Sequence, residues 1–293
     1  MRKGRLDLRK KYLLGLCCFA AMALSVSVGA AAADRYQGDQ SVIDATQADN
    51  GYVTAAYTGG GSQRIKVIVE KDGTKYSYDL NNQGQAEKFV LQMGNGNYQV
   101  RVLKNSTDNK YAAVQTVNFS VSLSSQFAPY LTSNQFVNYT SGSTTVKVAG
   151  EQAAKASDQL GKIDAIYNYV TNHITYDTQK AANVQSGYVP NVDTVLATGK
   201  GICFDYSAVL AAMLRSQNIP TKMVTGYVSP NGAYHAWNEV YVDGVGWIKT
   251  GEVYFDGKSW KLLDPTFLSS SKSSASIVKY IGNGSNYQGK YSY

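Results

Sequence analysis

Three residues whose types can together carry thiol chemistry occur in the C-terminal half of the chain: Cys203, His235 and Asp264. Cys203 directly follows the segment 199–202, in which two glycines are expected to form a tight turn into a helix. A thiolate is the attacking species, an imidazole can take and return its proton, and a carboxylate can fix the imidazole tautomer. The order of these residues predicts a cysteine nucleophile, a histidine base and an aspartate that orients the base.

Residues 1–33 have the pattern of a secretory signal peptide. Six Lys/Arg residues and one Asp lie in residues 1–11, an apolar run covers 12–28, and Ala-x-Ala cleavage options follow. Because the run is shorter than the roughly 20 residues of a spanning helix, we expect cleavage and no stable membrane anchor. Cleavage would leave Cys203 as the only cysteine and lower the formal net charge from +7 to +2. The expected location is extracellular or at the cell surface.

Composition and spacing also bear on partners and cofactors. The chain after residue 33 has no stripe of Lys and Arg, so a nucleic-acid partner is not expected. No Cys-x-x-Cys or His-x-x-x-His pair accompanies the three site residues, so neither a metal nor another cofactor is expected. The other histidine, His173, ends an amphipathic helical pattern and is interpreted as structural.

The hydrophobic period of the N-terminal half is that of β-strands. Short alternating runs between Gly, Asn and Asp turns predict a small antiparallel β-sandwich domain at 51–123. Residues 34–50 are expected to be an N-terminal segment before it, and residues 124–150 a linker after it. Because the sandwich has no cluster of site residues, we interpret it as a spacer, with binding of wall polymer or protein as the alternative.

The period becomes helical from residue 151. Helices are predicted around 163–170 and over 203–217, and strands over 222–227, 236–242, 246–250 and 253–255. Helices followed by an antiparallel sheet indicate an α+β catalytic domain at 151–268, with a C-terminal tail at 269–293. Cys203 would lie in the first turn of its helix, where backbone N–H groups could hold an oxyanion. His235 would lie at or just before the start of a strand, and Asp264 at the end of a neighbouring one.

These segments resemble the transglutaminase-like family, whose fold belongs with the papain-like thiol enzymes. The matching motifs are Lys200–Tyr206, His235–Val242 with Trp247, and Asp264–Thr266. The resemblance implies a Cys203 nucleophile, a His235 base and an Asp264 orienting group. The chain is also similar to a secreted bacterial branch in which a β-sandwich precedes the catalytic domain. It lacks the acidic calcium-binding clusters of the animal crosslinking enzymes, so calcium control is not implied.

The expected function is that of a secreted thiol acyltransferase or hydrolase that acts on protein or peptide amides through a Cys203 thioester. A lysine amine would resolve the thioester to a crosslink, and water would give deamidation or proteolysis; both outcomes remain open. One alternative is a cysteine peptidase of the same fold. The other is a non-catalytic adhesion or scaffold protein of the cell surface. The expected partner is a protein or peptide substrate, which could be associated with the cell wall.

Overall fold

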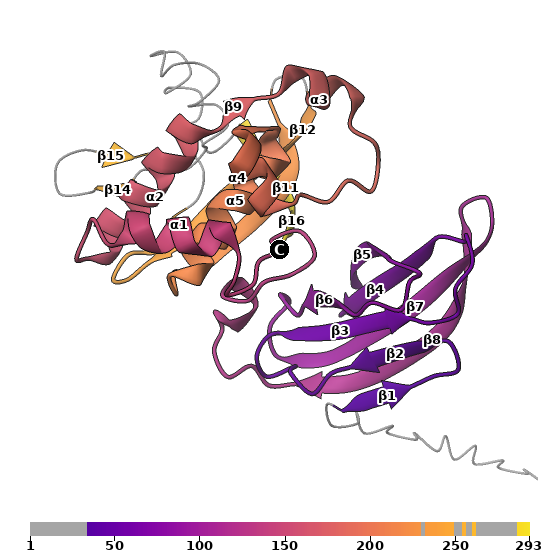
Figure 1. The fold of residues 1–293 in the computed structure, drawn as a ribbon. Helices are drawn as coiled ribbons and strands as arrows, with labels where there is room; N and C mark the ends of the chain where they lie inside the picture. The colour runs from indigo at the N-terminus through magenta and orange to yellow at the C-terminus, as the bar shows by residue number, and fades with distance from the viewer. Residues whose placement is uncertain (1–33, 230–231, 249–253, 256–259, 262–285) are drawn as a thin grey trace, which may run out of the picture.

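The chain folds into an N-terminal β domain and a C-terminal domain of helices packed on an antiparallel sheet (Figure 1). The structure, a computed structural model, describes residues 34–229, 232–248, 254–255, 260–261 and 286–293. The predicted leader at residues 1–33 lies outside these ranges. The predicted fold class is confirmed, because a β-rich region precedes an α+β domain of the expected kind.

The N-terminal domain consists of two four-stranded antiparallel sheets. One has the order β1 (Arg35–Gln37), β2 (Ser41–Asp44), β3 (Tyr52–Tyr57), β6 (Glu87–Val90). The other has the order β5 (Thr74–Leu80), β4 (Ile65–Lys71), β7 (Gly96–Thr107), β8 (Lys110–Val121). Alternate side chains of β4 point into the core, namely Ile65, Val67 and Val69. Tyr78 and Phe89 meet between the sheets, with ring centroids 5.0 Å apart.

The first sheet begins earlier than the predicted start at residue 51. β1 pairs with β2, and β2 pairs with β3, so two short strands within residues 34–50 belong to the sheet. These strands are only three and four residues long. Alternation over so few residues is too short to stand out as a strand pattern, although Ile43 is fully buried.

The chain between the two domains is ordered into helical turns. A 3-10 helix, η1, covers Ala128–Tyr130, and α1 (Thr144–Ala153) begins inside the predicted linker range of 124–150. α1, α2 (Gln159–His173) and α4 (Val192–Thr198) all contact α5 (Cys203–Ser216). Residues 208–214 of α5 are fully buried, which explains why this helix is apolar on every side. The short helix α3 (Thr178–Asn183) follows β9 (Thr175–Tyr176), which pairs in parallel with β10 (Lys200–Gly201).

The C-terminal sheet has the order β13 (Gly246–Ile248), β12 (Ala233–Val242), β11 (Thr221–Val228), β16 (Tyr287–Ser292). α5 packs against β11 and β12. A separate pair joins β14 (Tyr254–Phe255) to β15 (Trp260–Lys261), and the residues between these two strands lie outside the described ranges. β16 falls within the predicted tail at 269–293, so the end of that tail is a strand of the main sheet.

The end of the chain lies at the junction between the two domains (Figure 1). The rings of Tyr291 and Tyr293 pack against Tyr76 of β5, with centroids 5.2 and 5.7 Å apart. Arg215 of α5 donates hydrogen bonds to the carbonyl oxygens of Thr132 and Tyr293, at 2.8 and 2.5 Å, and burial lowers the pKa of Arg215 to about 10. One buried apolar cluster therefore continues from the β domain into the helices, so the domains are packed together rather than tethered.

Candidate active site

Cys203 is the first residue of α5, and Ile202 is the N-cap with an extended backbone. The preceding helix, α4, ends at Gly199 in the left-handed conformation with φ of 59°, a backbone state that favours glycine. Lys200 and Gly201 then pair with β9, so the start of α5 is held against residues 175–176. Cys203 is half-buried and lies at the positive end of the helix dipole, next to backbone N–H groups of the first turn.

The second glycine of the motif is needed for a different reason. Gly201 does not have a positive φ, but a Cβ at this position would lie 2.6 Å from the Cβ of Asp205. The predicted turn therefore uses Gly199 for its backbone conformation and Gly201 for close packing. A larger side chain at Gly201 would push away the residue that caps α5.

Asp205 is fully buried and caps the helix that carries Cys203. Its Oδ2 accepts hydrogen bonds from the N–H of Ile202 at 2.8 Å and from Nζ of Lys180 at 2.6 Å. Its Oδ1 accepts a hydrogen bond from the hydroxyl of Tyr188. Burial, followed by the hydrogen bond and the charge of Asp205, raises the pKa of Tyr188 above its usual value. These contacts fix α3 and the loop after it against the start of α5.

His235 is the third residue of β12, deeper in the strand than the predicted position at its edge. The side chain is 6% exposed, and its strand neighbour across the sheet is Gly226 of β11. The ring lies 6.3 Å from Trp237 and 6.4 Å from Tyr287, measured between ring centroids. A Cβ on Gly226 would come within 2.0 Å of the Gln288 carbonyl oxygen, so β16 crosses close to this point. Aromatic groups of β12 and β16 thus hold the imidazole in place.

One cavity of about 520 Å³ brings Cys203 and His235 together. The start of α5 and strands β11 and β12 line it, and residues 181–188 and Tyr176 form the rest of its wall. Tyr176 lines the same cavity as the thiol, and burial, followed by the charge of Cys203, raises the pKa of its phenol. The structure therefore places a thiol and an imidazole, from elements far apart in the sequence, around one space that a ligand could enter.

Asp264 lies outside the described residues, so its part in the site stays a prediction. Within the ranges that the structure covers, no group of three His, Cys, Asp or Glu residues is placed to hold a metal ion. None of the helices in the described part of the chain combines the length and the apolar run that a membrane crossing requires.

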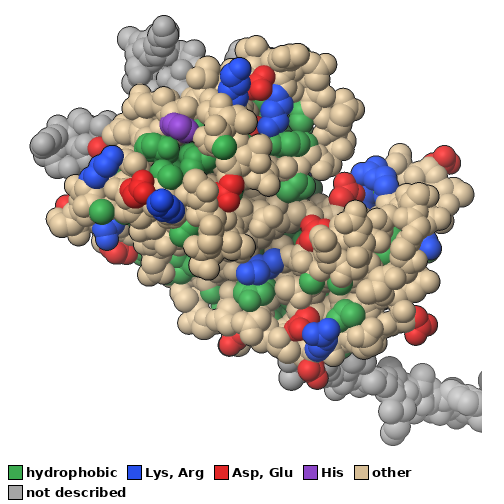
Figure 2. Space-filling model, viewed as in Figure 1, with side chains coloured by type: hydrophobic (Ala, Val, Ile, Leu, Met, Phe, Trp, Pro, Cys, Tyr) green, Lys and Arg blue, Asp and Glu red, His purple; other side chains and the backbone are tan. Residues whose placement is uncertain are grey.

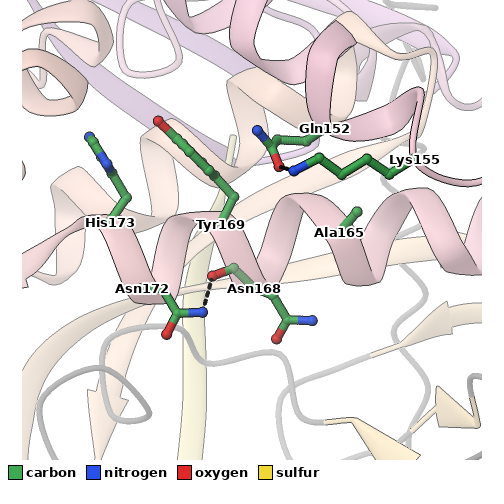
Figure 3. A pocket seen from close by; sticks show the side chains of 7 residues that line it. All are labelled: Gln152, Lys155, Ala165, Asn168, Tyr169, Asn172 and His173. Carbon is green, nitrogen blue, oxygen red and sulfur yellow. Dashed lines mark hydrogen bonds between the residues drawn. The ribbon is translucent and has the colours of Figure 1, made fainter.

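A second cavity, of about 460 Å³, lies on the face of α1 and α2 and contains His173 (Figure 3). Nε2 of His173 lies 2.7 Å from the carbonyl oxygen of Leu196, and its ring stacks on Tyr169 with centroids 4.9 Å apart. Asn172, on the same helix, donates its side-chain amide to the carbonyl of Asn168. His173 thus joins the end of α2 to α4, as expected for a structural histidine.

Three residues that shape the site, Asp205, Lys180 and Tyr188, are absent from the sequence-based candidates. For Asp205 one signal exists, since an acid three residues after an N-cap is a capping pattern. Lys180 and Tyr188 reach it from 25 and 17 residues away in the chain. No local pattern marks such contacts, because they depend on how the loop before α4 folds back over α5.

Comparison with known families covers the C-terminal domain. Residues 146–251 match the family model of the transglutaminase-like superfamily. The uncharacterized protein YebA of Bacillus subtilis (strain 168) is 29% identical over 109 residues, which are 31% of this chain and 15% of YebA. The UPF0252 protein MJ1282 of Methanocaldococcus jannaschii is 33% identical over 100 residues, which are 30% of this chain and 28% of MJ1282. This chain therefore spans less than a third of either relative.

Solved structures also resemble the chain in part. A candidate cysteine protease from Cytophaga hutchinsonii has a TM-score of 0.37 at 18% identity, over 79% of this chain and 68% of its own. The periplasmic domain of TgpA from Pseudomonas aeruginosa has a TM-score of 0.33 at 16% identity, over 79% of this chain and 94% of its own. Red sea bream transglutaminase has a TM-score of 0.32 at 12% identity, over 73% of this chain and 48% of its own.

Proposed function

We propose, from the premise that residues 146–251 are a domain of the transglutaminase-like superfamily, that this chain is a thiol acyltransferase or hydrolase of protein or peptide amides. The observation that carries the proposal is the shared cavity of Cys203 and His235. A thiol and an imidazole that line one space of about 520 Å³ are suited to attack on an amide carbonyl.

In the first step, the Cys203 sulfur bonds to the amide carbon and the thiol proton passes to His235. The carbonyl oxygen gains the negative charge, for which the N–H of Cys203 is available because the first turn of a helix has no internal acceptor for it. The N–H of Ile202 is not available, since it donates to Asp205. The carbon–nitrogen bond then breaks, His235 returns the proton to the leaving amine, and a thioester remains on Cys203.

In the second step, water or a lysine amine attacks the thioester carbon and gives its proton to His235. The carbon–sulfur bond breaks, and the Cys203 sulfur recovers the proton as the product leaves. Asp264 would accept the second imidazole N–H and keep the tautomer correct throughout. Water as the acceptor gives deamidation or scission, whereas an amine gives a crosslink.

The test is incubation of the purified chain with glutamine-containing peptides, with and without a labelled primary amine, followed by mass spectrometry. Amine incorporation indicates transfer, the mass gain of deamidation indicates hydrolysis, and backbone scission indicates a cysteine peptidase. Cys203→Ala should abolish every product while its circular dichroism spectrum stays that of the wild type. Unchanged peptides under all conditions would contradict the proposal and favour a non-catalytic scaffold or adhesion protein.

We also propose that this chemistry takes place outside the cytoplasm, on surface or wall-associated proteins. The support is the leader pattern of residues 1–33. The exported protein should therefore begin near Asp34 when its N-terminus is sequenced. Recovery of an intact N-terminus from the cell interior would contradict this location.

A further inference from the structure

The cavity that holds Cys203 and His235 adjoins another that reaches the N-terminal β domain. This junction cavity has a volume of about 260 Å³ and is lined by residues of both domains. The two spaces have several wall residues in common: Ser186, Gly187, Tyr188, Phe204, Thr225 and Tyr234. Figure 2 shows that the surface is hollowed between the domains. A substrate held at Cys203 could therefore extend along the shared wall toward the β domain.

The part of the junction cavity that the β domain forms carries a cluster of charged side chains from β4, from the residue before it and from β5. Nη2 of Arg64 lies 3.1 Å from Oδ2 of Asp79, and Nζ of Lys66 lies 3.7 Å from Oδ1 of the same carboxylate. Two cations thus share one carboxylate, so the side chains that line this cavity carry one net positive charge. The Arg64 side chain is 56% exposed, which leaves guanidinium N–H groups open to a ligand.

The charged end is held in a fixed position relative to the cysteine. A Cβ on Gly187 would lie 3.0 Å from Oδ2 of Asp79, so the loop after α3 touches the β domain at this carboxylate. Tyr188, the next residue of that loop, donates a hydrogen bond to Asp205, which lies two residues after Cys203 in α5. Gln135 of the connecting segment donates a hydrogen bond to the carbonyl oxygen of Asp79. The loop therefore links the basic cluster to the helix start through a short chain of direct contacts.

The wall between the two ends is aromatic. Phe204, the residue after Cys203, lines both cavities and packs against Tyr188 with ring centroids 6.5 Å apart. Tyr234 lines both from the opposite side and is 55% exposed. Aromatic rings offer apolar area with polar edges, which suits a peptide backbone lying across them.

We propose that the N-terminal β domain forms part of the substrate groove, and that Arg64 and Lys66 select peptide substrates with an acidic side chain distant from the reacting amide. The β domain is then a specificity element and not the spacer that its sequence suggested. The inference rests on the proposed function, because it takes the reacting amide to lie at Cys203.

The test is fluorescence anisotropy with labelled peptides and the Cys203→Ala chain, so that binding is measured without turnover. One peptide series carries a single Asp that is moved stepwise away from a glutamine, and a matched series carries Asn at the same places. We expect tighter binding of the Asp peptides at one spacing only, by about fivefold at low salt, and a smaller difference at high salt.

Two variants determine whether the basic cluster is the cause. Arg64→Ala with Lys66→Ala should remove the preference for Asp peptides and leave Asn peptides unaffected. The control, Lys75→Ala with Lys110→Ala, removes equal charge from exposed positions that line neither cavity and should keep the preference. Asp79→Asn should strengthen the preference, because it removes the negative charge between the two cations.

Equal binding of the two peptide series, or equal loss in both double variants, would overturn the inference. Selective binding of neutral wall glycan in place of any peptide would overturn it as well. Failure of the proposed function has a different signature, because the wild-type chain would then leave every peptide unmodified while the Cys203→Ala chain still bound the acidic ones.

Discussion

Asp205 accepts a hydrogen bond from the backbone N–H of Ile202 at 2.8 Å, one residue before the Cys203 thiol. The same carboxylate holds Lys180 and Tyr188, so one buried acid organises both the start of α5 and the loop that covers the site. It takes up the Ile202 N–H and not the N–H of Cys203. In the proposed mechanism Asp205 is thus a positioning residue for the Cys203 thiol.

Asp205→Ala should lower the free energy of unfolding by roughly 2–4 kcal/mol, because Lys180, Tyr188 and a buried N–H all lose their acceptor. Urea denaturation measures this loss. Glu151→Ala, an exposed acid on α1, is the matched control and should change stability by less than about 0.5 kcal/mol. A small effect of Asp205→Ala would show that the capping contacts do not stabilise the helix start.

Gly201→Ala should destabilise the chain by roughly 1–3 kcal/mol, since its new Cβ would lie 2.6 Å from the Cβ of Asp205. Gly150→Ala in α1 is the matched control, because a Cβ there meets no atom within 4 Å. That second change should stabilise the chain by about 0.5–1 kcal/mol through helix propensity. The Tm values of the two variants should therefore shift in opposite directions from that of the wild type.

The parts of the fold that the sequence predicts well are those with a clear local period. The helix at 203–217 was expected from apolar residues at helical spacing, and α5 covers Cys203–Ser216. The strands expected at 222–227 and 236–242 lie within β11 and β12. In each case the residues that mark the element are neighbours in sequence, so their pattern survives without knowledge of the tertiary structure.

The parts that could not be predicted depend on distant partners. β16 pairs with β11 although about 60 residues separate them, and nothing in its Tyr- and Gly-rich sequence specifies that edge. The junction cavity has the same origin, because Asp79 acquires its setting only when the loop at Gly187 packs against it. Residue type and order paired Cys203 with His235, but the sequence alone did not show which other elements line the cavity between α5 and β12.

Iodoacetamide should label Cys203 in the native chain, because this side chain is half-buried at the wall of an open cavity. Peptide mapping by mass spectrometry assigns the labelled residue. His235→Ala should slow the labelling near neutral pH, since the imidazole would no longer take the thiol proton. A thiol that reacts only after denaturation would contradict a catalytic role for Cys203.

Asp264→Asn should reduce kcat by roughly three to four orders of magnitude, as loss of the correct tautomer does in serine triads. Binding of substrate peptide should change little, because the carboxylate is expected to contact the imidazole and not the substrate. Steady-state kinetics separate the two effects. A near-normal kcat would remove Asp264 from the mechanism.

Asp193→Asn tests the contact by which Asp193 of α4 caps the start of α1. Its effect on the free energy of unfolding should depend on pH. Oδ1 of Asp193 accepts hydrogen bonds from the N–H and the hydroxyl of Thr145, at 2.8 and 2.7 Å. Burial acts to raise the pKa of Asp193, but these and neighbouring hydrogen bonds outweigh it and hold the pKa below the usual 3.8. As the pH is lowered, Asp193 is therefore protonated in the unfolded chain before it is protonated in the folded chain. The contribution of its carboxylate to the free energy of unfolding is complete above pH 3.8 and is lost as the pH falls through the folded pKa.

The expected cost of Asp193→Asn near neutral pH is about 1 kcal/mol, the usual contribution of a capping acid. Urea denaturation of both chains over a series of pH values should show this difference shrink once the pH falls below 3.8. Glu151→Gln should show no such convergence, because that side chain is exposed on α1. The free energies of unfolding of wild type and Asp193→Asn could instead differ by a constant amount through acid pH. That result would mean that packing of the side chain, and not the ionised carboxylate, stabilises the start of α1.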